Sequence, residues 1–453
     1  MADIRTRIDR IAYGGAGVGH YEDASVFVPF TLSGEEVNVR LEREKSGRWD
    51  ASLLNIMQPS SDRVAPECIH FGVCGGCHYQ HAVYPAQLRI KQQILRDTLQ
   101  RGGVTPPAEI ATHSAEPYHY RNRIQLRLER VEGQWRVGYS ERASHRFMPA
   151  IMCPISAETL WSTAEAMQTL LGEGHVLGKQ PLCEAEIFCN ADGSQVQLSI
   201  YLDIAHATMD RDAPAHFRGL CEALRQHCPQ LSGAGLWVWS AEEKHTRDNR
   251  AQHRTSLEVA TWGERLLRYE VPSATGTHTY EIARGGFFQV NRWMLPQLID
   301  LVTANRSGNS AWDLFAGVGL FSESLVRSFR SVTAVEIGER SFASLSGRFR
   351  TFGKPHTAQH KDTLAFLRED ARRLPVPDLI IVDPPRAGLG EPTCRELARV
   401  QTKELVYVSC DPTTLSRDLK WLIESGYRLT ELHLLDLFPQ TFHMESVAKL
   451  TRV

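Results

Sequence analysis

The chain has 453 residues, of which 42% are hydrophobic and 23% charged, and its formal net charge is −2 at neutral pH. This length exceeds what a single hydrophobic core usually serves, so two or three domains are expected. The composition is that of a folded globular protein, and no run of about 18 apolar residues indicates a membrane span. The first residues, MADIRTRIDR, lack the apolar core of a secretory signal. We therefore expect a cytoplasmic protein whose ten cysteines stay reduced.

Residues 1–58 predict a small β module. Strand-forming runs such as SVFVPF and EEVNVRL alternate there with Gly, Ser and Asp turns. Several short strands in so short a segment favour a five-stranded barrel of the OB type, which is a common platform for nucleic acids. An SH3-like barrel would produce a similar pattern. The next residues, QPSSDRVAPE, have the composition of a linker.

A cysteine cluster follows this linker. Cys68, Cys74 and Cys77 are spaced as Cys-x5-Cys-x2-Cys, and Cys153 in FMPAIMCPI offers a fourth thiol followed by proline. Four thiolates suit either zinc or an iron–sulfur cluster, so the spacing alone leaves both open. Three cysteines this close in a reducing compartment indicate a metal site.

Residues 59–284 are expected to form a central α+β domain that carries this cluster. The amphipathic stretch at 84–103 predicts a helix ended by two glycines, and this helix is a candidate to pack on the C-terminal domain although it precedes the central one. Between residues 118 and 146, seven arginines stand against three glutamates, with aromatic residues among them. Such a strip could contact RNA phosphates and unpaired bases. On charge alone, a solvated pair of antiparallel strands is the better interpretation.

Residues 285–453 show a different pattern of predicted secondary structure. The strand-like runs SAWDLF, SVTAVE, LIIVD and ELVYVS alternate with helical stretches. This rhythm predicts an open, mainly parallel, doubly wound sheet of the Rossmann-like kind. Ligands of such sheets bind at the carboxyl ends of the strands.

The first of these strand ends indicates a nucleoside cofactor. Gly317 and Gly319 follow the strand and precede a helix, so the backbone can approach a ligand closely. Ser322 stands where a dinucleotide site would have a third glycine, which disfavours NAD. Glu336 ends the next strand, in the usual place for an acid that holds ribose hydroxyls. The layout suits S-adenosylmethionine.

The later strand ends carry groups that could react. Asp383 ends LIIVD before two prolines, and Cys410 ends the following strand. A thiolate can add to carbon 6 of a pyrimidine, which makes carbon 5 nucleophilic enough to accept a methyl group. Glu445 is the candidate base for the carbon 5 proton, and His443 lies beside it. Taken singly, Cys410 would be a buried structural cysteine and His443 a surface histidine.

Five motifs in order extend this interpretation: GGFFQVN, DLFAGVGLFS, VDPPRAGL, YVSCDPTTLSRDL and FHMESV. Together they resemble the RNA 5-methyluridine methyltransferases, which include enzymes of transfer RNA and of 23S ribosomal RNA. The resemblance covers nearly the whole chain. The N-terminal module resembles a TRAM domain, and CIHFGVCGGCHYQH resembles the iron–sulfur segment of the ribosomal members.

The resemblance implies roles for particular residues. Cys410 would be the nucleophile and Glu445 the proton acceptor. The S-adenosylmethionine site would be lined by Gln289, Phe315, Glu336 and Asp383, with further contacts at Leu320 and Asp362. Leu320 stands where an Asn is frequent, so a contact there must come from the backbone. The four cysteines would hold a [4Fe–4S] cluster that fixes the RNA-binding domain.

The expected partner is therefore RNA, with ribosomal RNA favoured over transfer RNA, and the protein is expected to be monomeric. The target uridine should be flipped out of its RNA to reach Cys410. In this context the basic strip favours phosphate contact, with Arg121 and Arg123 as its best members.

Three alternative functions remain. A cytosine-5 methyltransferase would need a group for N3 and N4 of the base; an amino-group methyltransferase is disfavoured by Arg386 in DPPR; an RNA-binding factor with a retired fold is disfavoured by the intact reactive residues.

Overall fold

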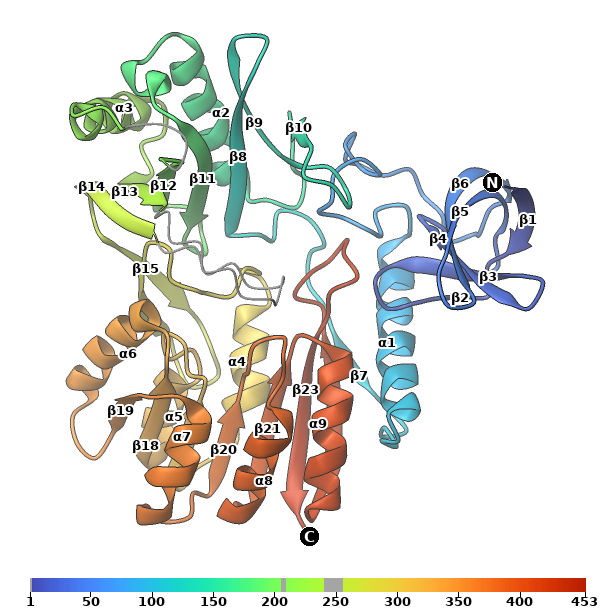
Figure 1. Ribbon diagram of the computed structural model, residues 1–453. Coiled ribbons are helices and arrows are strands. Elements are labelled where there is room, and N and C mark those ends of the chain that lie inside the picture. The colour runs from blue at the N-terminus through green and yellow to red at the C-terminus, as the bar shows by residue number, and fades with distance from the viewer. Residues whose placement is uncertain (1, 205–208, 240–255) are drawn as a thin grey trace.

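The computed structural model of the protein describes residues 2–204, 209–239 and 256–453. Its strands form three large sheets and a two-stranded ribbon, and the sheets follow one another along the chain as three separate lobes (Figure 1). No helix within these ranges is long and apolar enough to cross a membrane.

The N-terminal lobe is a curled sheet in the order β1-β5-β6-β4-β3-β2. Its pairs are antiparallel except for β4 with β6. Alternate residues such as Val26, Val28, Val37 and Val39 are fully buried inside the curl, as expected of strands with one face in a core. The sheet has six strands and not the expected five, because the two-residue β2 extends its edge. The strands are β1 (Asp3–Arg7), β2 (Arg10–Ile11), β3 (Ala16–Tyr21), β4 (Ala24–Pro29), β5 (Glu36–Glu44) and β6 (Arg48–Gln58).

The central lobe is a seven-stranded sheet in the order β10-β9-β8-β11-β12-β13-β14, covered by helices α2 and α3. The basic strip of the sequence forms the hairpin of β8 and β9, so the alternation of RIQLRLER does reflect an antiparallel pair. The elements are β8 (Arg123–Val131), β9 (Gln134–Ser140), β10 (Phe147–Pro149), α2 (Glu158–Gly172), the 3-10 helix η1 (Val176–Lys179), β11 (Leu182–Cys189), β12 (Val196–Leu202), α3 (Ala213–His227), β13 (Leu231–Trp239) and β14 (Ser256–Gly263). The ribbon of β15 (Leu266–Val271) and β16 (His278–Ala283) follows.

The C-terminal lobe is a doubly wound sheet in the order β19-β18-β17-β20-β21-β23-β22-β7. Strands β17 to β21 are parallel, whereas β23 runs antiparallel to β21. The order reverses between β17 and β20, which is the kind of switch point where such sheets bind ligands. The strands are β17 (Gly308–Leu314), β18 (Phe329–Glu336), β19 (Thr357–His360), β20 (Leu379–Val382), β21 (Glu404–Ser409), β22 (Tyr427–Leu435) and β23 (Glu445–Arg452).

Both faces of this sheet are covered. Leu405 and Tyr407 of β21 face one core and Val406 and Val408 the other, which explains the unbroken apolar run in the sequence. One face carries α7, α8 and α9, and the other carries α4, α5 and α6. The helices are α4 (Leu295–Thr303), α5 (Ser322–Ser328), α6 (Glu339–Phe352), α7 (Thr363–Glu369), the 3-10 helix η2 (Ala371–Arg373), α8 (Gly390–Val400) and α9 (Pro412–Glu424).

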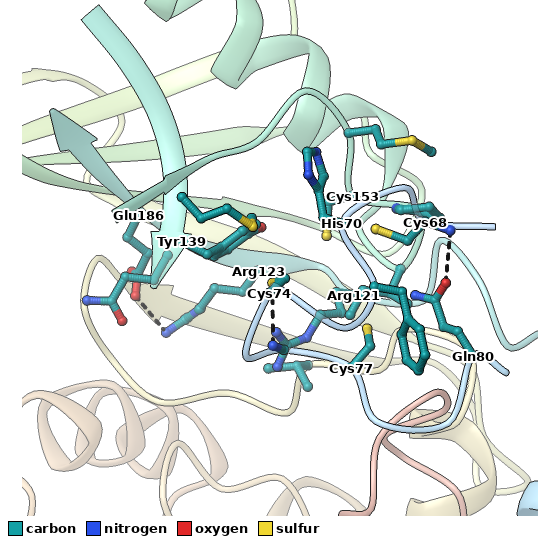
Figure 2. A pocket seen from close by; sticks show the side chains of 18 residues that line it. Cys68, His70, Cys74, Cys77, Gln80, Arg121, Arg123, Tyr139, Cys153 and Glu186 are labelled. Carbon is teal, nitrogen blue, oxygen red and sulfur yellow. Dashed lines mark hydrogen bonds and ion pairs between the residues drawn. The ribbon is translucent and has the colours of Figure 1, made fainter. Parts of the chain in front are cut away.

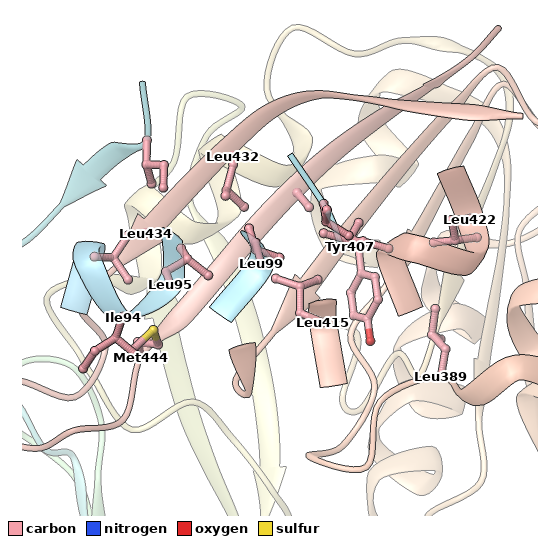
Figure 3. Close-up of a cluster of buried hydrophobic side chains, with 14 of the residues drawn as sticks. Ile94, Leu95, Leu99, Leu389, Tyr407, Leu415, Leu422, Leu432, Leu434 and Met444 are labelled. Carbon is pink, nitrogen blue, oxygen red and sulfur yellow. The ribbon is translucent and has the colours of Figure 1, made fainter. Parts of the chain in front are cut away.

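Two segments that precede the central lobe also belong to this C-terminal layer. Helix α1 (Tyr84–Arg101) buries Ile94, Leu95 and Leu99 in the same core as α9 and β22, as Figure 3 shows. Strand β7 (Ala111–His113) pairs with β22 at the edge of the sheet. The chain therefore crosses the C-terminal layer before it builds the central one.

Candidate active site and cysteine-lined cavity

Cys410 lies between the end of β21 and the start of α9. Asp411 caps the helix, because its Oδ1 accepts hydrogen bonds from the N–H groups of Thr413 and Thr414 at 2.8 and 3.2 Å. Pro412 occupies the first position of the helix, where the missing N–H is harmless. Strand, cap and proline together hold Cys410 at the carboxyl edge of the sheet, half-buried.

Glu445 opens β23 beside it. Because β23 is antiparallel to β21 and Ser446 pairs with Ser409, the start of one strand lies at the end of the other. The Glu445 side chain is buried, and its Oε1 has no hydrogen-bond partner among the described residues. Burial, together with the charge of Asp383, raises the pKa of this carboxyl well above its usual value.

Two further carboxyl groups lie at the ends of the adjacent strands. Burial raises the pKa of Asp313 and of Asp383 to about 7 in each case. Asp313 accepts a hydrogen bond from Ser322 Oγ at 2.5 Å, while its other oxygen has no partner in the described part of the chain. Burial and the charges of Glu445 and Asp383 also raise the pKa of Cys410 to about 12, against a lowering effect from Arg386. An acidic group of this kind favours a cation.

The glycine-containing turn after β17 is shaped for a close backbone approach. Phe315, Gly317 and Gly319 all have positive φ, at 63°, 57° and 91°. A side chain at Gly319 would place its Cβ 2.9 Å from Leu345 Cδ1, so this position needs glycine. The Gly317 N–H donates to Glu336 Oε2 at 2.8 Å, which ties the turn to the end of β18.

The remaining residues expected at a cofactor lie around this turn or near it. Leu320 offers no free carbonyl, since its oxygen accepts a hydrogen bond from Tyr280 Oη at 2.8 Å. Asp362 caps α7 by accepting the Ala365 N–H at 3.0 Å. Gln289 is buried, and its carbonyl oxygen accepts a hydrogen bond from Asn122.

Sequence reasoning missed two contacts at the site. Tyr13 of the N-terminal lobe donates its hydroxyl to Asp411 Oδ2 at 3.1 Å, although 398 residues separate them. Arg386 donates to His443 Nδ1 at 3.1 Å, and burial together with that positive charge lowers the pKa of His443 to about 3. His443 is thus a neutral, bonded side chain at the site and not a surface histidine. No sequence spacing could signal the Tyr13 contact.

The four cysteines of the cluster line one cavity of about 320 Å³, shown in Figure 2. Cys68, Cys74 and Cys77 come from the loop before α1, and Cys153 from the loop after β10. In the described residues, however, no group of three or more His, Cys, Asp or Glu side chains is spaced to hold a metal ion. Burial raises the pKa of Cys77 to about 12. The structure brings the expected ligands to one cavity without forming a ligand shell.

Arg121 and Arg123 also line this cavity, which differs from the exposed positions expected of phosphate contacts. The Arg123 side chain is only 13% exposed, donates to the Gly286 carbonyl at 2.7 Å and stacks on Phe188. Ile124, Leu126 and Leu128 of β8 face the core of the central sheet, so Arg123 lies on the opposite face of the strand. It is covered there by Gly286, Phe188 and Glu186. The exposed arginines of the strip are others, such as Arg136 and Arg146.

The doubly wound sheet, its glycine turn and the acid at the end of β18 define the fold of an S-adenosylmethionine-dependent methyltransferase. The model of the tRNA (uracil-5-)-methyltransferase family matches residues 373–453. The chain is 31% identical over 452 residues to a 23S rRNA (uracil(1939)-C(5))-methyltransferase of Pseudomonas entomophila, covering 98% of this chain and 92% of that one. A protein of the same name from Halomonas elongata is 30% identical to this chain, and the match covers 98% of this chain and 88% of that protein. The chain therefore belongs to the RNA uracil-C5 methyltransferase family.

A solved structure gives the same fold over its whole length. The tRNA (uracil-54, C5)-methyltransferase of Pyrococcus abyssi, solved in complex with S-adenosyl-L-homocysteine, matches with a TM-score of 0.73. The match covers 99% of this chain and 100% of that one at 22% identity. All three lobes thus share one arrangement with a protein of distant sequence.

Proposed function

We propose that this protein transfers a methyl group from S-adenosylmethionine to carbon 5 of one uridine in 23S ribosomal RNA. The observation that carries the proposal is the pairing of Cys410 with Glu445 at one sheet edge. A thiol there adjoins a buried carboxyl with an unpartnered oxygen. A nucleophile and a base in such proximity are what addition to a pyrimidine and its reversal require.

The proposed chemistry has two stages. Cys410, once its thiol has lost its proton, adds through sulfur to carbon 6 of a flipped uracil. The electron pair of the double bond passes to carbon 5, which takes the methyl group as the bond between that methyl group and the donor sulfur breaks and leaves a neutral thioether. Glu445, which must itself be deprotonated for this step, then accepts the carbon 5 proton. The C–H electron pair re-forms the double bond as the C6–S bond breaks, and the sulfur leaves as thiolate.

The resting state of Cys410 fits a reaction that starts only with ligands bound. Its pKa of about 12 means that the free protein holds a thiol, since burial disfavours the thiolate and the acidic groups Glu445 and Asp383 disfavour a further negative charge. Thiol attack requires loss of that proton. The positively charged sulfonium of the methyl donor, when bound, would offset the negative charge of these acidic groups. The binding residues for the donor are Phe315, Gly317, Gly319 and Glu336 on the turn, with Gln289, Leu320, Asp362 and Asp383.

The mechanism is tested by trapping with 5-fluorouridine RNA and S-adenosylmethionine. A fluorine at carbon 5 cannot be removed as a proton, so the adduct persists and runs as a larger species on a denaturing gel. Cys410→Ala should abolish both the adduct and methyl transfer. Cys183 lies in the central sheet, where its thiol donates to the Tyr201 backbone carbonyl, so Cys183→Ser should leave both unchanged. Methylation of uridine by Cys410→Ala would overturn the assigned nucleophile.

The choice of ribosomal RNA rests on the two relatives named above. Both are named as 23S rRNA methyltransferases, and this chain matches most of the length of each. A transfer RNA substrate is the competing choice, because the matching solved structure is a tRNA enzyme. Mapping 5-methyluridine in the RNA of a strain that lacks this gene decides between them. Loss of the methyl group from tRNA alone would overturn the assignment.

We further propose that Cys68, Cys74, Cys77 and Cys153 hold a [4Fe–4S] cluster. Four thiols on one cavity of about 320 Å³ could hold either a cluster or zinc, and the resemblance of CIHFGVCGGCHYQH to the iron–sulfur segment of the family favours the cluster. The role would be structural, because methyl transfer needs no electron. Arg121 and Arg123 would then neutralise the charge of the cluster more readily than they would bind phosphate.

Anaerobic purification tests the cluster. The expected sample is brown and contains about four iron and four sulfide per chain, in keeping with a cluster held by four thiolates. Cys153→Ser should lower the iron content, while Cys228→Ser, a cysteine of the central core, should not. A colourless sample with one zinc per chain would contradict the assignment.

A further inference from the structure

The loop that leads into Glu445, residues 436–444, is held by one polar stripe on α1. This loop joins β22 to β23 and extends from the sheet toward the N-terminal half of the molecule (Figure 1). Tyr84, Gln87 and Lys91 are spaced by three and four residues, which places them on one face of the helix. All three side chains bind the loop.

The centre of the stripe is an ion pair without solvent contact. Lys91 Nζ donates to Asp436 Oδ1 at 2.5 Å and to the Phe438 carbonyl at 2.9 Å, and the side chains of Lys91 and Asp436 are both 0% exposed. Tyr84 Oη donates to Asp436 Oδ2 at 2.9 Å. Removing two charges from water offsets most of their attraction, so an ion pair of this kind explains geometry better than stability.

Gln87 supplies a second, reciprocal contact. Its Nε2 donates to Gln440 Oε1 at 2.9 Å, and its Oε1 accepts the Gln440 N–H at 3.0 Å. Gln440 has a positive φ of 67°, a conformation that a residue other than glycine holds only under firm constraint. The amide of one helix residue therefore fixes both the backbone and the side chain of this turn.

The remaining carbonyl groups of the loop are bound by three other segments. His78 and Tyr79, which follow Cys77, donate their N–H groups to the Gln440 carbonyl at 2.8 and 3.0 Å. Tyr120 donates to the Pro439 carbonyl and Asn291 to the Leu437 carbonyl, each at 3.1 Å. Parts of the chain far apart in sequence thus converge on one short loop.

We propose that Lys91 and Gln87 are positioning residues for the proton abstraction assigned to Glu445. They act through Asp436 and Gln440, which set the path of the loop and so the place where β23 begins. This inference rests on the proposed function of Glu445. Cys410 lies outside the loop, on the turn between β21 and α9, so displacement of the loop should affect the addition step less than proton abstraction.

A displaced base leaves a distinctive kinetic signature. Addition and methyl transfer proceed, while release slows, so that enzyme accumulates as a covalent adduct with methylated RNA. A misplacement of about 1 Å can lower a rate by roughly a hundredfold. General destabilisation would instead reduce adduct and turnover together.

The test is Lys91→Met assayed with uridine RNA and S-adenosylmethionine. We expect kcat to fall by roughly tenfold or more with KM for RNA unchanged, and the denatured reaction to contain an RNA adduct that wild type does not accumulate. The rate of trapping by 5-fluorouridine RNA should fall much less than kcat. The matched control is Arg306→Gln, which breaks an ion pair of 2.7 Å with Glu404 at the amino end of β21 and should change none of these quantities.

Lys91→Met leaves Asp436 as a buried unpaired charge, and this variant could fail to fold. Lys91→Met with Asp436→Leu removes that charge and should restore the folded protein while still accumulating the adduct. Wild-type turnover in the double variant, or a parallel loss of trapping and turnover in folded Lys91→Met, would overturn the positioning role.

The same assay separates this inference from the proposed function. Glu445→Gln should accumulate the adduct in the way expected of Lys91→Met. If Glu445→Gln turns over normally, the proposed base is wrong. If Glu445→Gln accumulates adduct and Lys91→Met does not, only the stripe is refuted.

Discussion

At the scale of single residues, the site is defined by carboxyl groups that the fold has removed from water. Asp383 and Glu445 have raised pKa values because burial disfavours their charged forms, and because Asp313 repels a charge on Asp383 and Asp383 repels a charge on Glu445. Their sequence positions were readable as strand ends, but the repulsion follows only from the folded arrangement. This repulsion has a consequence for stability.

Glu445→Gln should stabilise the free protein at neutral and higher pH. The folded protein holds the Glu445 proton more tightly than the unfolded chain, so this group contributes full stability below about pH 4 and loses it as pH rises toward the folded pKa. Glutamine does not titrate and mimics the protonated acid. Thermal denaturation should show equal melting temperatures near pH 4 and a higher one for Glu445→Gln, by a few degrees, at pH 8.

Glu431→Gln is the matched control of opposite sign. Lys449 and His433 lower the pKa of Glu431, so its charged form stabilises the fold above its unfolded pKa. Glu431→Gln should therefore melt at or below the wild-type temperature at pH 8. A Glu445→Gln protein that also melts lower at pH 8 would show that Glu445 is charged and stabilised in the free protein.

At the scale of elements, the start of α9 connects the turn that carries Cys410 to the N-terminal lobe. Asp411 uses one oxygen to cap the helix and the other to accept the Tyr13 hydroxyl. The cap belongs to the local sequence, since Asp before Pro is a strong helix-start signal. The second bond belongs to the tertiary structure. The turn that carries Cys410 is thus held from both sides.

Asp411→Ala should lower stability by about 1 kcal/mol through loss of the cap, and should slow adduct formation because the Cys410 turn loosens. Asp411→Asn keeps an accepting oxygen for the cap and should retain most of the stability. Tyr13→Phe removes only the second bond. Melting temperature and the rate of trapping by 5-fluorouridine RNA measure both effects; a normal trapping rate in Asp411→Ala would mean that the strand alone positions Cys410.

At the scale of the whole molecule, the three lobes meet around the loop before Glu445. Helix α1 and strand β7 belong to the N-terminal half of the chain but pack in the C-terminal layer. The segment after Cys77 binds the loop before Glu445. A division of the chain at residue 284 therefore separates sequence regions but cuts through one packed unit.

The sequence alone identified the elements that carry the chemistry. The runs WDLF, AVE, LIIVD and ELVYVS end where β17, β18, β20 and β21 end or within a residue of it, because fully apolar runs bounded by Gly, Pro and Asp leave little choice of structure. Five ordered motifs were enough to indicate the family to which the chain belongs. The cysteine spacing predicted a metal site; the four cysteines line one cavity, but no metal-binding group is formed among the described residues.

Only the tertiary structure decided what these elements touch. Arg121 and Arg123 line the cysteine cavity, and contacts with Gly286 and Phe188 cover Arg123, a result that a count of charges could not reveal. Tyr13 reached Asp411, and Lys91 reached Asp436 across 345 residues. Local sequence determines backbone propensity and the pattern of buried faces, whereas contacts between distant segments depend on how whole layers pack. For this reason the sequence could place Cys410 and Glu445 at strand ends, and it could not indicate the groups that hold them in place.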